Sequence, residues 1–335
     1  MSTDSRGTVV ITGGAGYIGS ALTGELLRRG YQVHVLDALL FGGDSILAYL
    51  AHPSFSFEKT DLAAPEVALD FQGVRAVFHL AALVGFPVCQ QVGEETAFHY
   101  NVTTTQRIFE AAERSGVERF IFASTYSNYG MSPDGAPVTE DSPTYPQSLY
   151  ARTKIAAEVF LRDRGLRTAC APLIPRFATL FGISPRTRFD LLINQFVLEA
   201  VVKRKLILYQ GDYRRSFVHI GDVVEALTLL LEAPLAGTRN EVFNIGSPEG
   251  NFRKHDVAAL VARQVPGTTV EQRDLSFGGD MRDVQVSSAK AERVLGFRAR
   301  RTVEEGIREV HAAITCGLIK EPTHTRYRNH QFLID

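Results

Sequence analysis

The sequence has almost no excess of charge of either sign. Its 36 lysines and arginines face 37 aspartates and glutamates, and the formal net charge is −1. Proteins that attract nucleic acid or an acidic membrane surface usually carry a basic excess. We therefore expect neither partner, and we interpret the short basic run Arg298-Ala299-Arg300-Arg301 as a solvated face.

Cysteine is scarce, and no two cysteines form a C-x-x-C pair. The three residues Cys89, Cys170 and Cys316 are far apart in the sequence and cannot all pair with one another. This predicts reduced thiols and a cytoplasmic protein. The nine histidines include no His-Glu-x-x-His spacing, so we expect no metal site.

Long apolar runs and internal repeats are also missing. No uninterrupted apolar segment approaches the length of a membrane span, and the sequence does not begin with a charged segment followed by an apolar one. We therefore expect no membrane segment. A chain of 335 residues exceeds what one hydrophobic core usually organises, which predicts a large domain and a smaller lobe.

The sequence does contain a glycine-rich loop between an expected strand and an expected helix. The β-branched run 8–12 is typical of a buried parallel strand, and residues 18–29 have a helical pattern. Gly13 permits a tight turn, Gly16 lets the backbone approach a pyrophosphate, and Gly19 lets helix and strand pack closely. This pattern predicts a dinucleotide-binding loop.

An acidic residue follows the second expected strand. Residues 32–36 form that strand, and Asp37 comes directly after it. A carboxylate there accepts hydrogen bonds from a ribose diol and repels a 2′-phosphate, which favours NAD over NADP. Arg28, Arg29 and Lys59 would weaken this preference if they faced the cofactor, but we expect them on solvated faces.

Tyr150 and Lys154 form a Tyr-x-x-x-Lys pair downstream of the glycine loop. Residues four apart share a helix face, so the Lys154 ammonium is expected to favour the phenolate form of Tyr150. A free tyrosine has a pKa of about 10, and a base at neutral pH needs such help. The pair by itself is weak evidence, but together with the loop it predicts hydride-transfer chemistry.

Further strand patterns alternate with helical stretches. This alternation predicts an α/β fold with a doubly wound parallel Rossmann sheet and a smaller C-terminal α/β substrate lobe. We expect the lobes to be interleaved in sequence, with residues 1–176 plus 219–247 in the first and 177–218 plus 248–335 in the second. The expected strands lie at residues 56–59, 76–79, 120–123, 170–174 and 242–245.

The ordered motifs resemble the extended short-chain dehydrogenases/reductases of the nucleotide-sugar epimerase/dehydratase family, across nearly the whole chain. The family's catalytic motif is matched by Tyr150-Ala151-Arg152-Thr153-Lys154. The other matching segments are Thr12-Gly13-Gly14-Ala15-Gly16-Tyr17-Ile18-Gly19, Asp61-Leu62, His79-Leu80-Ala81-Ala82, Asn101-Val102, Ser124-Thr125, Asn128-Tyr129-Gly130, Arg215-Ser216-Phe217-Val218-His219-Ile220-Gly221-Asp222 and Leu295-Gly296-Phe297.

The resemblance implies a set of cofactor-binding residues and NAD as the cofactor. Asp61 and Leu62 would contact adenine, and Ala81 and Ala82 would line the cofactor channel, unless they only pack at strand ends. The implied cofactor-binding residues are Gly13, Gly16, Tyr17, Ile18, Gly19, Asp37, Asp61, Leu62, Leu80, Ala81, Ala82, Asn101, Tyr150 and Lys154.

By the same resemblance, Thr125 would be catalytic with Tyr150 and Lys154, because it lies four residues before Tyr129; Ser124 is the competing hydroxyl. The partner would be a nucleotide-diphosphate sugar. Arg215 and Arg282 are candidates for its diphosphate, since a guanidinium matches phosphate in geometry and charge, although surface ion pairs remain an alternative. The remaining substrate-binding candidates are Thr125, Thr179, which stands where many relatives have Asn, and Tyr209, which is equally compatible with a core position.

The family resemblance implies oxidation of a sugar by NAD, most plausibly at C4, with Tyr150 as base. Related 4,6-dehydratases carry an Asp-Glu pair after the catalytic Thr, whereas this chain has Tyr126 and Ser127. We therefore predict a 4-epimerase. A reductase or dehydrogenase, a dehydratase with groups from Asp134, Glu140 and Asp141, and a non-enzymatic cofactor sensor are the alternatives.

Two amphipathic stretches, residues 103–115 and 149–162, correspond to the helices that pair across the dimer interface of the resembling family. A homodimer is therefore expected. The alternative is that both helices cover one face of the sheet in a monomer.

Overall fold

The computed structural model describes residues 6–132, 135–273 and 282–329. Its largest element is an eight-stranded, fully parallel sheet with the order β11-β7-β5-β4-β1-β2-β3, in which β6 also pairs with β7. The strands are β1 (Thr8–Thr12), β2 (Gln32–Asp37), β3 (Phe55–Lys59), β4 (Val74–His79), β5 (Arg119–Phe122), β6 (Ser124–Thr125), β7 (Ala171–Phe177) and β11 (Glu241–Ile245).

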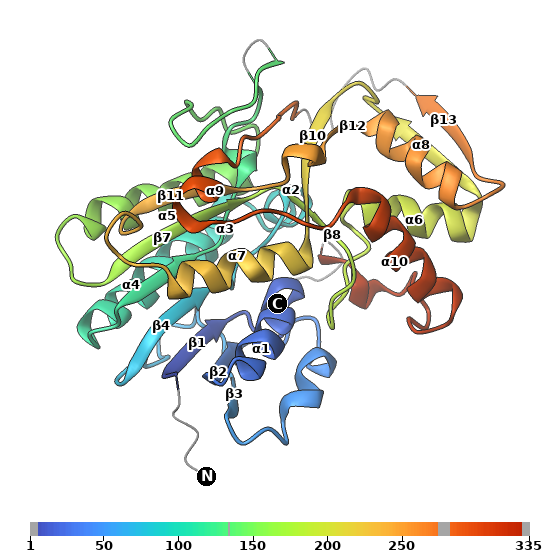
Figure 1. The fold of residues 1–335 in the computed structure, drawn as a ribbon. Coiled ribbons are helices and arrows are strands. Elements are labelled where there is room, and N and C mark those ends of the chain that lie inside the picture. The colour runs from blue at the N-terminus through green and yellow to red at the C-terminus, as the bar shows by residue number, and fades with distance from the viewer. Residues whose placement is uncertain (1–5, 133–134, 274–281, 330–335) are drawn as a thin grey trace.

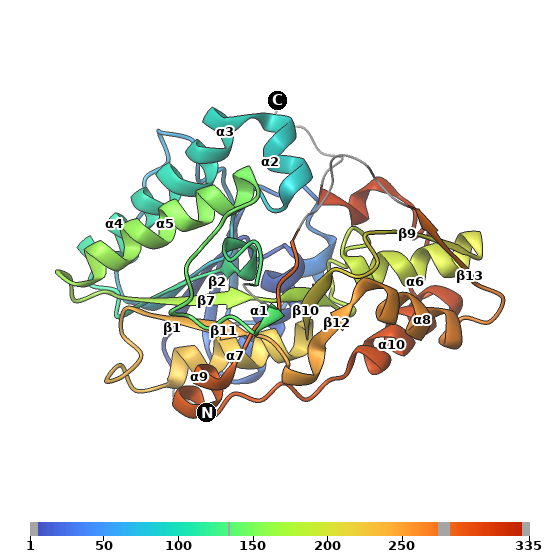
Figure 2. The ribbon, with the colours of Figure 1, turned by 90° about the horizontal axis from the view of Figure 1, so that it is seen from above.

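Helices cover both faces of this sheet, because its apolar strands are buried on both sides. One face packs against α1 (Tyr17–Arg28), α7 (Ile220–Glu232) and α9 (Ala289–Leu295), and the other against α4 (Thr104–Arg114) and α5 (Leu149–Gly165). Figure 2 shows the two helical layers on opposite sides of the sheet. The predicted α/β fold with a doubly wound Rossmann sheet is confirmed.

The expected elements differ from the observed ones mainly at their ends. The strand expected at 170–174 continues to Phe177, and the helix expected at 149–162 continues to Gly165. The longer β7 matters for the site, because Arg176 pairs with Ser124 and Phe177 pairs with Thr125 in the parallel register. Strand β7 therefore helps to hold β6 in place.

A second group of elements lies beside the sheet (Figure 1). Its core is a separate cluster of buried side chains from the helices α6 (Leu192–Lys203), α8 (Lys254–Gln264) and α10 (Val303–Thr315). Its strands are β8 (Thr179–Phe181), β10 (Arg214–His219) and β12 (Asn251–Arg253) in one sheet, and β9 (Lys205–Tyr209) and β13 (Thr269–Arg273) in another. The exact lobe boundaries stay a prediction.

Short helices connect these elements. They are α2 (Phe86–Val92), α3 (Glu94–Phe98), the π-helix η2 (His99–Thr103), and the 3-10 helices η1 (Asp44–Tyr49), η3 (Tyr126–Asn128), η5 (Pro248–Gly250) and η6 (Thr325–Tyr327). Among the described residues, no helix is both long and apolar enough to cross a bilayer. The same part of the chain contains no group of three or more side chains arranged to hold a metal ion.

The strand order reverses between β1 and β4. Strands β2 and β3 lie on one side of β1, whereas β4, β5 and β7 lie on its other side. In a doubly wound sheet, the crevice at the carboxyl ends of the strands beside such a reversal is the usual ligand site. The glycine loop after β1 and the segment after β4 both lie at this edge.

Candidate active site

A cavity of about 1040 Å³ lies at this edge, between the sheet and the second lobe. This volume is at the upper end of the range for small-molecule sites. The structure brings nearly all of the predicted site residues to its walls. Those that line it are Gly13, Gly16, Tyr17, Ile18, Gly19, Asp37, Asp61, Leu62, Leu80, Ala81, Ala82, Thr125, Tyr150, Lys154, Thr179, Tyr209, Arg215 and Arg282.

The glycine loop forms a cradle that larger side chains would fill. Gly13 has a φ of +72°, and a Cβ there would lie 2.7 Å from the backbone nitrogen of Ala81. A Cβ on Gly19 would lie 2.3 Å from the carbonyl oxygen of Gly13. Only glycine satisfies both positions, and the N-terminus of α1, which begins at Tyr17, presents backbone N–H groups to an anion. The loop therefore fits a dinucleotide pyrophosphate.

Asp37 lies at the end of β2 and holds the turn around the cradle. Its carboxylate accepts hydrogen bonds from the backbone N–H groups of Ala15 (3.0 Å) and Leu39 (2.8 Å). Burial raises the pKa of Asp37, while these two hydrogen bonds oppose the rise. Each carboxylate oxygen has a further lone pair for a ribose hydroxyl. The position suits the predicted ribose contact.

Asn101 is the predicted cofactor residue that the structure does not place on the cavity wall. It is buried and exchanges hydrogen bonds with Leu83, whose N–H donates to Oδ1 (2.8 Å) and whose carbonyl accepts from Nδ2 (3.0 Å). Its Nδ2 also lies 3.0 Å from the hydroxyl of Thr153 on α5. Asn101 therefore supports the segment after β4 from behind the wall.

Burial opposes the electrostatic help that Tyr150 is expected to receive from Lys154. Tyr150 is partly buried, and burial raises its pKa above the usual value, whereas the positive charges of Arg188 and Arg282 act in the opposite direction. Lys154 donates a hydrogen bond to the carbonyl of Ala123 (2.9 Å), and burial lowers its pKa to about 8. The assistance of Lys154 to the phenolate, which the four-residue spacing predicted, stays a prediction.

Thr125 ends β6 and caps the short helix η3. Its Oγ1 accepts a hydrogen bond from the backbone N–H of Ser127 (3.1 Å) and donates to the Ser127 hydroxyl (3.0 Å). Nη1 of Arg282 donates to the same hydroxyl at 2.5 Å. Ser127 and Arg282 thus lie beside the expected catalytic hydroxyl, and the sequence reasoning missed this role of Ser127.

The competing hydroxyl of Ser124 is committed to a buried ion pair. It donates to Glu158, which lies one turn beyond Lys154 on α5. Glu158 in turn binds Arg176 of β7 with two hydrogen bonds of 3.0 and 2.5 Å, and both side chains are about 95% buried. This geometry favours Thr125 over Ser124 as the hydroxyl available to a substrate.

The two positions after Thr125 carry no carboxylate. The Tyr126 hydroxyl lies 2.7 Å from the hydroxyl of Thr179 on β8, and the guanidinium carbon of Arg282 lies 5.3 Å from the Tyr126 ring centre. Thr179, which departs from the family's usual Asn, is thus joined to Tyr126. Together they form one wall of the cavity near Thr125.

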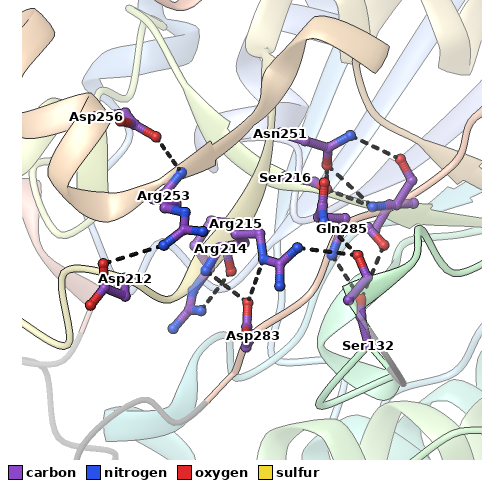
Figure 3. Close-up of polar contacts among 12 residues, drawn as sticks. Ser132, Asp212, Arg214, Arg215, Ser216, Asn251, Arg253, Asp256, Asp283 and Gln285 are labelled. Carbon is purple, nitrogen blue, oxygen red and sulfur yellow. Dashed lines mark hydrogen bonds and ion pairs between the residues drawn. The ribbon is translucent and has the colours of Figure 1, made fainter.

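Arg215 lies on β10, at the centre of the polar network in Figure 3. It is 1% exposed, and its Nη1 donates to the carbonyl of Arg214 (2.9 Å). Arg214 binds Asp283 through its backbone N–H (2.9 Å). Asp283 is next to Arg282, so this network brings both arginines predicted to bind the substrate diphosphate to the same cavity.

Tyr209 ends β9 at the outer part of the cavity. Its side chain is 36% exposed, and its carbonyl accepts a hydrogen bond from Lys254 Nζ (3.2 Å). A half-exposed ring on a cavity wall is more consistent with the predicted base contact than with a core position.

The sequence reasoning did not identify the charged residues of the segment after β8. Arg186, Arg188 and Asp190 all line the cavity. Arg188 binds Asp190 through two hydrogen bonds of 2.9 and 3.0 Å. The only available signal was the arginine-rich loop composition, and no spacing rule connects such a loop to the glycine cradle.

Comparison with known proteins identifies the family. A family model described as "NAD dependent epimerase/dehydratase family" matches residues 9–246. The chain belongs to this family. Among curated members, a UDP-glucose 4-epimerase of Bacillus subtilis (strain 168) is 31% identical over 330 residues, covering 89% of this chain and 94% of the relative.

Solved structures of similar proteins agree with this assignment. A dTDP-glucose 4,6-dehydratase, DesIV from Streptomyces venezuelae, with NAD and TYD bound, is 27% identical with a TM-score of 0.81, covering 95% of this chain and 100% of that one. MoeE5 in complex with UDP-glucose and NAD is 28% identical with a TM-score of 0.77, covering 93% and 100%. As in these members of the epimerase/dehydratase family, the cofactor is NAD, and the glycine cradle and Asp37 fit it.

Proposed function

We propose that this epimerase/dehydratase family member is an NAD-dependent nucleotide-sugar 4-epimerase. The observation that carries the proposal is the chemistry beside Thr125, where Tyr126 and Ser127 replace the paired carboxylates of the related dehydratases. Tyr126 is hydrogen-bonded to Thr179, and Ser127 is hydrogen-bonded to Thr125 and Arg282. A keto intermediate then has no acid/base pair at this position to eliminate water.

The acidic side chains elsewhere on the wall are engaged or distant from Thr125. Of the described carboxylates that line the cavity, Asp37 and Asp61 belong to the adenosine half, Asp190 is paired with Arg188, and Glu199 is paired with Lys203. Glu140, a candidate for dehydratase chemistry, accepts a hydrogen bond from the backbone N–H of Asn244 (2.7 Å). Asp134, another candidate, lies outside the described residues.

The proposed reaction assigns a task to each catalytic side chain. Bound NAD supplies a hydride acceptor that is regenerated in the same turnover. Tyr150 takes the proton from the sugar C4 hydroxyl as that carbon is oxidised, and returns it on reduction. Thr125 donates a hydrogen bond to the reacting oxygen. Lys154, held at the Ala123 carbonyl and one helix turn after Tyr150 on α5, would add positive charge on the same helix face.

The second lobe would bind the nucleotide diphosphate while the keto sugar turns. Arg215 and Arg282 present guanidinium groups suited to phosphate oxygens, and Tyr209 offers a ring for the base. Holding the diphosphate leaves the sugar free to rotate about its link to phosphate. Return of the hydride to the opposite face of C4 would invert that carbon.

The decisive experiment follows a deuterium label. The purified protein is incubated with UDP-glucose or UDP-glucuronic acid carrying deuterium at C4, without added cofactor, and the products are analysed by NMR and mass spectrometry. We expect the C4 epimer, with the deuterium retained at C4 and no gain or loss of mass. The same protein, denatured before use, is expected to release NAD.

Other outcomes contradict the proposal. Loss of water with exchange at C5 would assign a dehydratase. Product formation that consumes added reduced cofactor stoichiometrically would assign a reductase. Release of NADP in place of NAD would contradict the preference attributed to Asp37.

A further inference from the structure

The loop after β8 is fastened to the first turn of α1. The Tyr17 hydroxyl donates to the carbonyl of Gly182 (2.8 Å), and the Ser184 hydroxyl donates to the carbonyl of Tyr17 (2.6 Å). Ser184 Oγ also lies 3.2 Å from Ser20 Oγ. These contacts hold a loop of the second lobe against the helix turn that fits a pyrophosphate.

Two residues beyond Ser184, Arg186 lines the cavity with an incompletely satisfied guanidinium. The residue is 7% exposed, and its guanidinium carbon lies 4.1 Å from the centre of the Phe41 ring. Its Nη2 makes one long hydrogen bond, of 3.4 Å, to the carbonyl of Arg326. Within the described part of the chain, its Nε is buried and has no hydrogen-bond partner.

This charge is poorly compensated by the protein. Burial and the nearby charge of Arg188 lower the pKa of Arg186 to about 9, against the partial opposition of Asp190 and Asp37. Asp190 is already bound twice by Arg188, and both Asp37 oxygens accept backbone hydrogen bonds. A buried cation in this state is costly unless an anion joins it.

The position of Arg186 indicates which anion it would bind. Phe41, which lies under the guanidinium, is four residues beyond Asp37 at the end of β2. Arg186 therefore faces the loop at the adenosine half of the site. Tyr17, to which its loop is bound, belongs to the first turn of α1. Both neighbours lie on the cofactor side of the cavity, whereas Arg215 and Arg282 lie on the side of β10.

We propose that Arg186 binds the pyrophosphate of NAD, so that the phosphates are held between the N-terminus of α1 and a guanidinium from the second lobe. The bound anion completes the hydrogen bonding of a buried arginine, and Phe41 orients the guanidinium plane. The second lobe thereby takes part in retaining the cofactor. This inference depends on NAD binding and is independent of whether the sugar is epimerised.

The test measures ligand binding to the full-length chain freed of cofactor. NAD, ADP-ribose, adenosine and UDP are titrated calorimetrically into the parent protein, Arg186→Met and Arg186→Lys. Arg298→Met, at a side chain that is 76% exposed, is the matched control. The melting temperature of each protein is recorded with and without NAD.

We expect Arg186→Met to weaken NAD and ADP-ribose by about 10- to 100-fold, the range for loss of a charge-assisted contact. Adenosine, which has no phosphate, should bind within about twofold of the parent. The cofactor-free protein should not melt at a lower temperature, because an uncompensated charge has been removed, while the rise in melting temperature caused by NAD should shrink. Arg186→Lys should be intermediate.

Three results would overturn the proposal. Unchanged NAD and ADP-ribose affinities would do so directly. Weaker UDP binding with normal NAD binding would assign Arg186 to the substrate diphosphate. An equal loss for adenosine and ADP-ribose, together with a lower melting temperature of the cofactor-free protein, would make Arg186 a purely structural residue.

Discussion

At the scale of single residues, the proposed reaction requires Tyr150 to lose its proton where burial opposes the negative charge. Burial raises the pKa of Tyr150, and the nearby guanidinium groups of Arg188 and Arg282 act against that rise. Burial also lowers the pKa of Lys154, to about 8. In the proposed reaction, positive charge from bound ligands would add to that of these guanidinium groups in favouring the phenolate.

The first prediction concerns the Tyr150 hydroxyl. Tyr150→Phe removes the proton-transfer group and keeps the ring, so turnover should fall by about 10²- to 10⁴-fold, while the Kd for NAD stays within about threefold. Product formation and NAD titration measure the two effects separately. Turnover equal to that of the parent would refute the role of Tyr150.

The second prediction concerns His79, which ends β4. Its Nε2 lies 2.9 Å from the Thr105 hydroxyl, which itself donates to the carbonyl of Asn101, so Nε2 carries a proton. Its Nδ1 then accepts from the Thr12 hydroxyl (2.7 Å). Burial lowers the pKa of His79 to about 3, so the folded protein keeps this ring neutral.

A depressed histidine pKa makes folding weaker in acid. Between about pH 6.5 and pH 3 the unfolded chain binds a proton that the folded chain does not, so stability falls as pH falls. From about pH 7.5 to about pH 5.5, His79 should remove about 1 kcal/mol from the free energy of unfolding. Urea unfolding at both pH values should show that the free energy of unfolding decreases less in His79→Gln than in the parent. The control His52→Gln, at an exposed histidine, should show the same decrease as the parent. Equal decreases in all three proteins would contradict the prediction.

At the scale of elements, helix α5 joins the chemistry to the sheet. Tyr150, Lys154 and Glu158 follow one another at intervals of four, so they lie along one face of the helix. Ser148 caps its N-terminus by accepting from the backbone N–H of Ala151 (3.2 Å). Through Glu158, the helix is bound to Ser124, next to Thr125, and to Arg176 on β7.

The third prediction is that this ion pair positions α5 against β6. Glu158→Gln leaves a buried arginine charge without its partner, which should cost about 3–5 kcal/mol of unfolding free energy. Replacing both residues, Glu158→Gln with Arg176→Met, should recover part of that stability. The solvent-exposed pair Arg152–Glu94 supplies the control, since Glu94→Gln should cost about 0–1 kcal/mol.

Activity distinguishes positioning from stability alone. The double variant should remain less active than the parent at temperatures where both are folded, because Thr125 and Tyr150 are no longer held by the same contact. A double variant with full kcat would show that the pair serves only stability.

At the scale of the whole molecule, the outer face of α4 and α5 bears on the expected homodimer. Val159 on α5 is 63% exposed, and Leu166, just beyond this helix, is 76% exposed. An apolar side chain this exposed suits a helical interface between two copies. The homodimer stays a prediction. The alternative is a monomer in which both helices only cover one face of the sheet.

The fourth prediction tests it through size. The parent should elute with about twice the chain mass of 36.9 kDa in light scattering, and Val159→Glu should shift it to the monomer by placing a charge in the interface. Val202→Glu, on α6 and 51% exposed, should leave the mass unchanged. A parent protein of single-chain mass would make the expectation wrong.

Several features followed from short stretches of sequence, because they depend on local geometry. The buried strand β1, the turn at Gly13 and the acid after β2 are close neighbours along the chain, and their steric and hydrogen-bonding requirements restrict which residues can occupy them. The spacing of Tyr150 and Lys154 likewise needs only a helix. The alternation of strand and helix patterns then implied the parallel, doubly wound sheet.

Other features required the chain to be packed. Arg186 is 167 residues from Gly19, and it reaches the cofactor side only because its loop is bound to Tyr17. Ser127 lies beside Arg282 because the fold brings together two residues that are 155 positions apart in the sequence. The pKa of Tyr150 depends on how much protein surrounds it, which helix periodicity does not report. Local chemistry thus determined the cradle and the spacing of Tyr150 and Lys154, while burial and long-range contacts decided which charges surround them.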